Sequence, residues 1–296
     1  MHWLATSALG VALLFPLTGT AIGPGEVNAL PASPATVTAK YGRDALQFGE
    51  LRLPAGKGPF PVAIIVHGGC WTRGFASVRM TAPIASALAA RGVATWNVEY
   101  RQVGDAGAGW PGTFRDWGAA TDQLRTLARV HPLDLQRVAV VGHSAGAHAA
   151  LWIAARDQLR RQREIGVANP LPIHAAFAID GPADLAGLVG ADAQICGKPV
   201  IAPLMGGTPA QRPERYRWAS PQQLLATSAS QFLVASAVLT AAEAHRYAGL
   251  IQRRGGKAQV LELPGGHFDV IAPGQPGWTR IEDLIVSTLL GDRGHD

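Results

Sequence analysis

Residues 137–155 read RVAVVGHSAGAHAALWIAA, and this stretch decides the fold. The apolar run at 137–141 predicts a buried strand, and the small residues at 145–155 predict a helix. Between them lies the pattern G-x-S-x-G, with Ser144 at its centre. A strand that passes directly into a helix needs a very tight turn, and the flanking glycines relieve the crowding there. We therefore expect Ser144 to project from the sheet edge as a nucleophile, with the Ala145 amide facing a developing oxyanion.

The rest of the chain alternates between strand-like and helix-like segments. The predicted strands are 45–53, 60–66, 93–99, 137–141, 173–179, 231–236 and 258–263. The predicted helices are 80–90, 114–130, 145–156, 220–226, 241–254 and 278–290. This alternation is typical of an α/β fold with a mostly parallel sheet and helices on both faces. Because the strand at 45–53 alternates and ends at Pro54, we place it at the sheet edge.

Composition excludes several classes of protein. The 296 residues are 48% hydrophobic and 16% charged, which is too apolar for a disordered chain. The net charge of +5 is scattered, apart from a basic run at 156–163 that we interpret as a solvated helix face. No nucleic-acid motif accompanies it. No spacing typical of metal ligands, phosphate loops or dinucleotide sites is present, so the sequence predicts neither a metal nor a cofactor.

The N-terminal part of the chain predicts export. An apolar block at 3–17 has the length of a signal peptide, and Val27-Asn28-Ala29 fits a cleavage site, so we assign residues 1–29 to a signal peptide. Residues 30–39 are interpreted as a linker and 40–296 as a single domain, with a possible small cap at about 181–218. After removal of the signal peptide no membrane span is expected. Export also allows the two cysteines, Cys70 and Cys196, to form a disulfide.

Two further motifs follow predicted strands. His67-Gly68-Gly69-Cys70-Trp71 comes directly after strand 60–66, and glycines there allow the backbone to approach a bound carbonyl. The amides of Gly69 and Cys70 are therefore expected to join that of Ala145 in an oxyanion hole, whereas His67 is expected to be a buried structural residue. Pro264-Gly265-Gly266-His267-Phe268 follows the last strand, and the order of serine before histidine makes His267 the candidate base.

Together these segments resemble the α/β-hydrolases of the esterase/lipase group with an HGGxW motif, which includes kynurenine-formamidase-like and BD-FAE-like hydrolases. The resemblance covers roughly residues 40–290 and is carried by HGGCW (67–71), NVEYR (97–101), GWPGTFRD (109–116), GHSAG (142–146), RYRWASP (215–221) and GGHF (265–268). It implies an α/β-hydrolase fold and cofactor-free hydrolysis of a small-molecule carboxylic ester or aryl amide through an acyl-enzyme, with Ser144 as nucleophile and His267 as base. It also implies scaffold roles for Glu99, Arg101 and Asp116.

The acid of the triad is the open question. In the family it usually follows the strand that corresponds to 231–236, but here Glu243 is the only carboxylate in that place. Thr240 and Glu243 also match a capping box, which is a purely structural role. Asp180 ends the preceding strand, at the edge where ligands bind in such sheets. We predict Asp180 as the acid, with Glu243 and Asp184 as alternatives.

The reaction itself stays open at this point. The same triad serves arylformamidases and peptidases, and a hydrolase fold without a working acid would bind a ligand and not turn it over.

Overall fold

The computed structural model describes residues 21–225 and 228–291 of the chain. Its centre is an eight-stranded sheet with the order β1-β2-β4-β3-β5-β6-β7-β8. The strands are β1 (Val37–Lys40), β2 (Phe48–Arg52), β3 (Phe60–Val66), β4 (Ala94–Val98), β5 (Leu133–His143), β6 (Ala175–Ile179), β7 (Ser230–Ala235) and β8 (Ala258–Glu262). β1 and β2 are antiparallel to their neighbours, and β4 through β8 run parallel.

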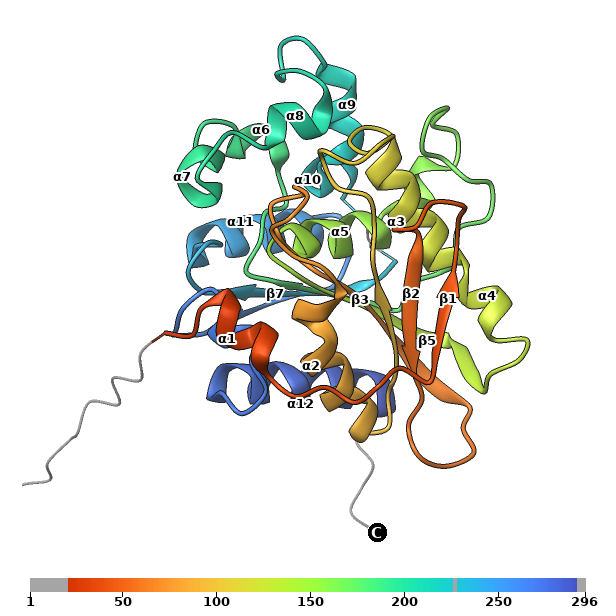
Figure 1. Ribbon diagram of the computed structural model, residues 1–296. Helices are drawn as coiled ribbons and strands as arrows, with labels where there is room; N and C mark the ends of the chain where they lie inside the picture. The colour runs from red at the N-terminus through yellow and green to blue at the C-terminus, as the bar shows by residue number, and fades with distance from the viewer. Residues whose placement is uncertain (1–20, 226–227, 292–296) are drawn as a thin grey trace, which may run out of the picture.

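Helices cover both faces of the sheet (Figure 1). The longer ones are α2 (Val78–Ala90), α3 (Gly112–Asp122), α5 (Ala145–Ala154), α11 (Ala241–Arg253) and α12 (Pro276–Leu290). α2 and α12 lie below the sheet in this view, and α3, α5 and α11 lie above it. The central strands are buried on both sides because their side chains alternate between two cores. On β3, for example, Ile64 faces one core and Ile65 the other.

The parallel sheet predicted from the alternation of segments is confirmed, and every predicted strand is present. The prediction of 45–53 as the edge is wrong, because β1 pairs with β2 from Val37↔Leu51 to Lys40↔Phe48 and forms the edge itself. The predicted helix at 114–130 is divided into α3 and the short α4 (Leu124–Leu127).

The N-terminal boundary also differs from the sequence prediction. Helix α1 (Pro24–Ala29) packs beside α2, and its Val27 has no exposed surface. Burial of a valine contributes about 1.5–3 kcal/mol to stability. The interpretation of 30–39 as a linker is wrong at its end, because β1 begins at Val37. The apolar block at 3–17 lies outside the described residues.

The basic run at 156–163 is only partly a solvated face. Helix α5 ends at Ala154, and Arg156 begins a short 3₁₀ helix, η1 (Arg156–Leu159). The Arg156 guanidinium is 3% exposed and donates to Asp122 Oδ2 over 2.5 Å. The expectation of full solvation fails for Arg156 because Asp122, on α3, gives this cation a partner inside the fold.

The described part of the segment between β6 and β7 carries five short helices. They lie above the sheet in Figure 1. They are α6 (Leu185–Leu188), α7 (Asp192–Cys196), α8 (Ile201–Met205), α9 (Pro213–Ala219) and α10 (Pro221–Leu224). Cys196 at the end of α7 forms a disulfide with Cys70, as expected from the sequence. That this segment caps a substrate site stays a prediction. None of the helices within 21–225 and 228–291 is long and apolar enough to cross a bilayer.

His148 links α5 to this segment. Its Nε2 donates to the Ala219 carbonyl over 2.8 Å, and the rings of Trp71, Phe114 and Trp117 surround it edge-on. Burial disfavours the imidazolium and lowers the pKa of His148 to about 4, although the Ala219 carbonyl opposes this shift.

We expect His148 to make the fold sensitive to acid. An unfolded histidine titrates near pH 6.5, so between about pH 6.5 and 4 the unfolded chain binds a proton that the folded chain refuses. Stability therefore falls as the pH falls through this window. In His148→Gln, which keeps a donor, the slope of the unfolding free energy against pH should decrease by up to about 1.4 kcal/mol per pH unit. Urea unfolding at several pH values measures this slope, and an unchanged slope would contradict the assignment.

The disulfide is expected to stabilise the protein substantially. It joins residues 126 apart in sequence, and the chain-entropy model gives at most about 5 kcal/mol for a loop of that length. Cys196→Ser should therefore lower the urea midpoint. Reductant should lower the midpoint of the parent protein to a similar value and leave that of Cys196→Ser unchanged. Equal midpoints for the parent and the variant under oxidising conditions would contradict this prediction.

Candidate active site

Ser144 occupies a strained turn between β5 and α5. It follows the last residue of β5 and has φ 57° and ψ −120°, a backbone conformation that residues other than glycine rarely adopt. A Cβ at Gly142 would collide with the Gly146 carbonyl, and one at Gly146 would collide with the Val66 carbonyl of β3. The turn predicted from G-x-S-x-G is therefore present, and both glycines are required by close backbone contacts.

Loops from two neighbouring strands approach Ser144 closely. A Cβ added at Gly68 would lie 3.0 Å from the Ser144 Cβ and 2.9 Å from the His143 carbonyl oxygen. A Cβ added at Gly181 would collide with the Ser144 carbonyl. The loops after β3 and β6 thus meet the serine turn at the carboxyl edge of the sheet, where ligands bind in parallel α/β folds.

The loop after β3 has an unusual backbone path. Gly69, Cys70 and Trp71 all have positive φ, at 93°, 51° and 52°. Neither the Gly69 amide nor the Cys70 amide donates a hydrogen bond to any other described residue. Ala145 is the first residue of α5, where a helix leaves its amide free of an intrahelical partner. The three amides named as oxyanion donors therefore lie on the loop after β3 and at the start of α5, and they are available to a ligand.

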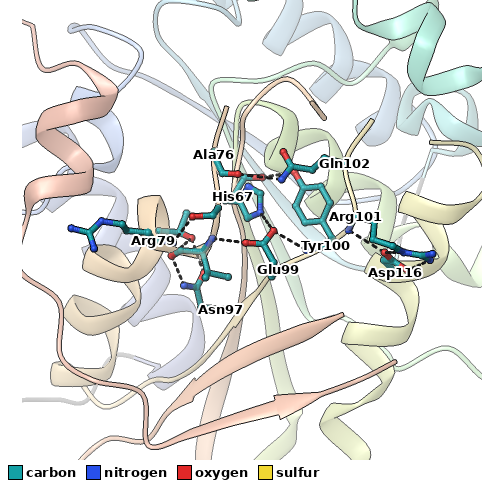
Figure 2. Close-up of polar contacts among 12 residues, drawn as sticks. His67, Ala76, Arg79, Asn97, Glu99, Tyr100, Arg101, Gln102 and Asp116 are labelled. Carbon is teal, nitrogen blue, oxygen red and sulfur yellow. Dashed lines mark hydrogen bonds and ion pairs between the residues drawn. The ribbon is translucent and has the colours of Figure 1, made fainter. Parts of the chain in front are cut away.

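A buried polar network surrounds His67, the residue at the start of this loop (Figure 2). His67 Nε2 lies 2.9 Å from Glu99 Oε1, and its ring stacks on Tyr100 with 4.4 Å between centroids. The Tyr100 hydroxyl donates to the His67 carbonyl over 3.0 Å. Glu99 Oε2 accepts from the amide of Val78, the first residue of α2, over 3.1 Å. His67 is therefore the structural residue that the sequence predicted.

Electrostatics favour an ionised Glu99 within this network. Burial alone would raise the pKa of its carboxyl group, but the neighbouring His67 ring and the amides of Tyr100 and Val78 outweigh burial and lower it. Arg101 and Asp116 form a separate bidentate pair with contacts of 2.8 and 2.7 Å. Glu99, Arg101 and Asp116 thus hold the scaffold, as the resemblance implied.

Asp180 reaches His267 directly. It lies one residue beyond β6 with φ 50°, and its Oδ2 is 2.7 Å from His267 Nδ1. The carboxylate also accepts four backbone amides from the loop after β7, at 2.8–3.3 Å; these donors are Ser236, Ala237, Val238 and Leu239. The distance between acid and histidine predicted for Asp180 is therefore confirmed.

The same contacts keep Asp180 charged. Its side chain has no exposed surface, and burial favours the protonated acid. The hydrogen bond with His267 and the amides of Leu239 and Val238 overcome that effect and lower the pKa of Asp180. A carboxylate fixed in this way orients the imidazole and stabilises its protonated form.

The two alternative acids have structural roles. Glu243 Oε2 accepts from the Thr240 amide over 3.1 Å, and the Thr240 hydroxyl accepts from the Glu243 amide over 3.3 Å, so the capping box at the start of α11 is present. Asp184 caps α6 by accepting from the Ala186 amide over 3.1 Å.

The loop that carries His267 has two anchors that the sequence analysis missed. His143 Nε2 donates to the His267 carbonyl over 2.7 Å, and the two rings lie 4.3 Å apart. Burial and the nearby His267 lower the pKa of His143 to about 3, so this ring is neutral. Asp269 Oδ2 accepts from the Gly266 amide over 2.7 Å. His143 is the variable residue of G-x-S-x-G, so no motif points to it.

The described residues were also compared with the arrangements of side chains that bind metal ions. No three His, Cys, Asp or Glu side chains gather there in an arrangement that would hold a metal ion.

Comparison with known families decides the classification. The model of the BD-FAE family matches residues 50–237, which is more than half of the chain. The chain belongs to the BD-FAE family. This is a family of esterases of the α/β-hydrolase type. The matched range of this BD-FAE protein contains Ser144, Asp180 and the loop after β3, and it ends before His267.

Several esterases of known structure have a fold similar to that of this chain. A truncated carbohydrate esterase from gut microbiota is 19% identical with a TM-score of 0.72, covering 88% of this chain and 97% of its own. An esterase from Pyrobaculum calidifontis is 18% identical with a TM-score of 0.68, covering 90% and 88%. Esterase 2 of Thermogutta terrifontis with bound butyrate is 15% identical with a TM-score of 0.68, covering 87% and 94%. No curated protein sequence matches the chain.

If Asp180 orients His267, Asp180→Asn should fold and lose activity. Asparagine tolerates the positive φ at this position and still accepts amide hydrogen bonds. Loss of the carboxylate should lower kcat by roughly 10⁴, as in other triads without their acid. Glu243→Gln is the matched control and should keep near-normal kcat, because glutamine also completes a capping box. An inactive Glu243→Gln with an active Asp180→Asn would contradict this assignment.

Proposed function

We propose that this chain is a serine hydrolase that cleaves carboxylic esters through an acyl-enzyme. The observation that carries the proposal is the contact of 2.7 Å between the buried Asp180 carboxylate and His267, on the same sheet edge as the strained Ser144 turn. Membership of an esterase family supports the reaction class. The neighbouring esterase 2 of Thermogutta terrifontis is phosphonylated by sarin in one structure and binds butyrate in another, which supports covalent chemistry on small acyl groups.

In the first step, His267 accepts the hydroxyl proton of Ser144 as the serine oxygen attacks the ester carbonyl. The Nδ1 of His267 faces Asp180, so Nε2 is the nitrogen that takes the proton. Asp180 then stabilises the imidazolium, with the four amides of the loop after β7 holding its charge in place.

Negative charge develops on the carbonyl oxygen during this attack. The amides of Gly69, Cys70 and Ala145 donate to it, and the network of His67 and Glu99 fixes the loop that presents the first two. Donors that are fixed before the reaction need no reorganisation as charge develops. His267 next protonates the leaving alcohol, and water activated by the same histidine cleaves the acyl-enzyme and releases the acid.

Two other readings predict different results. An arylformamidase or peptidase uses the same triad on an amide, so a screen of p-nitrophenyl esters of graded chain length together with N-formylkynurenine separates substrate classes. The second hypothesis is a protein that binds a ligand without turnover, and it depends on the absence of an Asp after strand 231–236.

The contact of 2.7 Å between Asp180 and His267 speaks against this hypothesis, because Asp180 can take the place of the absent acid.

Ser144→Ala should abolish ester turnover and labelling by a fluorophosphonate probe. Alanine should leave the fold intact, because it removes only the hydroxyl oxygen from a turn whose geometry the neighbouring glycines maintain. Ser287→Ala, an exposed serine on α12, is the control and should keep both activities. Mass spectrometry of the labelled peptide locates the modified residue. Unlabelled Ser144 in the folded parent protein would favour the ligand-binding reading.

A further inference from the structure

We propose that export of this protein includes cleavage between Ala21 and Ile22, and that the freed Ile22 ammonium forms an ion pair with Asp269. The proposal rests on export and is independent of the reaction proposed above. It replaces the cleavage site after Ala29 that the sequence alone suggested.

Between the apolar block at 3–17 and residue 30, two small-x-small sites end in alanine. Gly19-Thr20-Ala21 comes directly after the apolar block at 3–17, and Val27-Asn28-Ala29 lies eight residues further along. Both satisfy the small-x-small rule for leader cleavage. The choice between them therefore depends on which residues the folded protein needs.

The folded protein needs the residues between the two sites. Val27 on α1 has no exposed surface, and Ile22 packs against the same core as α2 and α12. The Gly23 amide donates to Glu26 Oε2 over 3.0 Å and closes the start of α1, which lies beside α2 in Figure 1. Cleavage after Ala29 would remove this helix and uncover the core beneath it. Cleavage after Ala21, which is exposed, would remove none of these contacts.

The partner for a new chain end is already in place. The Ile22 backbone nitrogen donates to Asp269 Oδ1 over 2.7 Å, across 247 residues of sequence. The leader peptidase of an export pathway hydrolyses the peptide bond between Ala21 and Ile22, and the oxygen of water becomes part of the Ala21 carboxylate. The Ile22 nitrogen leaves as an amine and is protonated. An amide-to-carboxylate hydrogen bond then becomes an ammonium–carboxylate pair, which is a stronger interaction.

This ion pair would lie on the loop of the candidate base. Asp269 is two residues beyond His267, and its other oxygen accepts from the Gly266 amide over 2.7 Å. One carboxylate therefore connects the new N-terminus to the residue immediately before His267. A Cβ built at Gly266 would lie only 3.0 Å from the Ala21 Cβ, which shows how closely the two segments pack.

The cleavage site is tested by expressing the full chain in a bacterial host and sequencing the N-terminus of the exported protein. We expect Ile22. Ala21→Leu should abolish this N-terminus, and Ala29→Leu, a matched change at the other site, should leave it unchanged. An N-terminus at Leu30, at another residue, or at an uncleaved Met1 would overturn the proposal. The readout needs no enzymatic activity, so its failure is distinct from failure of the proposed function.

The ion pair is tested by a double-mutant cycle on the exported protein. Asp269→Asn should lower the melting temperature by about 2–4 °C. A Met inserted between Ala21 and Ile22 displaces the ammonium by one residue and should lower it similarly. The two changes together should lower the melting temperature little more than either change alone, because both remove the same ion pair. Additive losses would show that Asp269 acts only through Gly266 and would overturn the ion pair.

Discussion

The buried carboxylate of Asp180 is the interaction on which the rest of the site depends. An unpaired anion without solvent contact costs several kcal/mol, so the fold must surround it with donors. The loop after β7 supplies four amides, and the loop after β8 supplies His267. The Asp180 carboxylate therefore connects the carboxyl ends of β6, β7 and β8 through its hydrogen bonds. The loop after β7, which lacks an acid of its own, orients the acid of its neighbour.

Close backbone packing around Ser144 is the second constraint. Gly68, Gly146 and Gly181 lie where a Cβ would meet the serine turn or the strand beside it. Ser144 and Asp180 both hold positive φ at this edge, a strain that persists only where the surrounding structure fixes it. The surrounding packing supplies that support, because β3, β5 and β6 are buried on both faces. The glycine motifs are thus consequences of three loops that meet at one point.

The sequence predicted the parts of the fold whose signals are local. The β-branched run at 60–66 matches β3, and the capping box at Thr240 starts α11 where expected. It failed where tertiary contacts decide the outcome. β1 is four residues long and is held by pairing with β2, and α1 is held by packing against α2. The sequence predicts an exposed Arg156, but in the folded protein this side chain is buried beside Asp122.

The loop after β3 and the loop that carries His267 are each held at two separate places, and this explains how a site built from loops is kept in one geometry. The first is fixed through His67 by Glu99 and through Cys70 by the disulfide to α7. The second is fixed at the His267 carbonyl by His143 and at Gly266 by Asp269. Since His143 precedes Ser144, its neutral imidazole couples the Ser144 turn to the backbone of the loop that carries His267. In the proposed mechanism, the oxyanion donors and the base are thus positioned before a substrate binds, which is the condition under which fixed dipoles lower a barrier most.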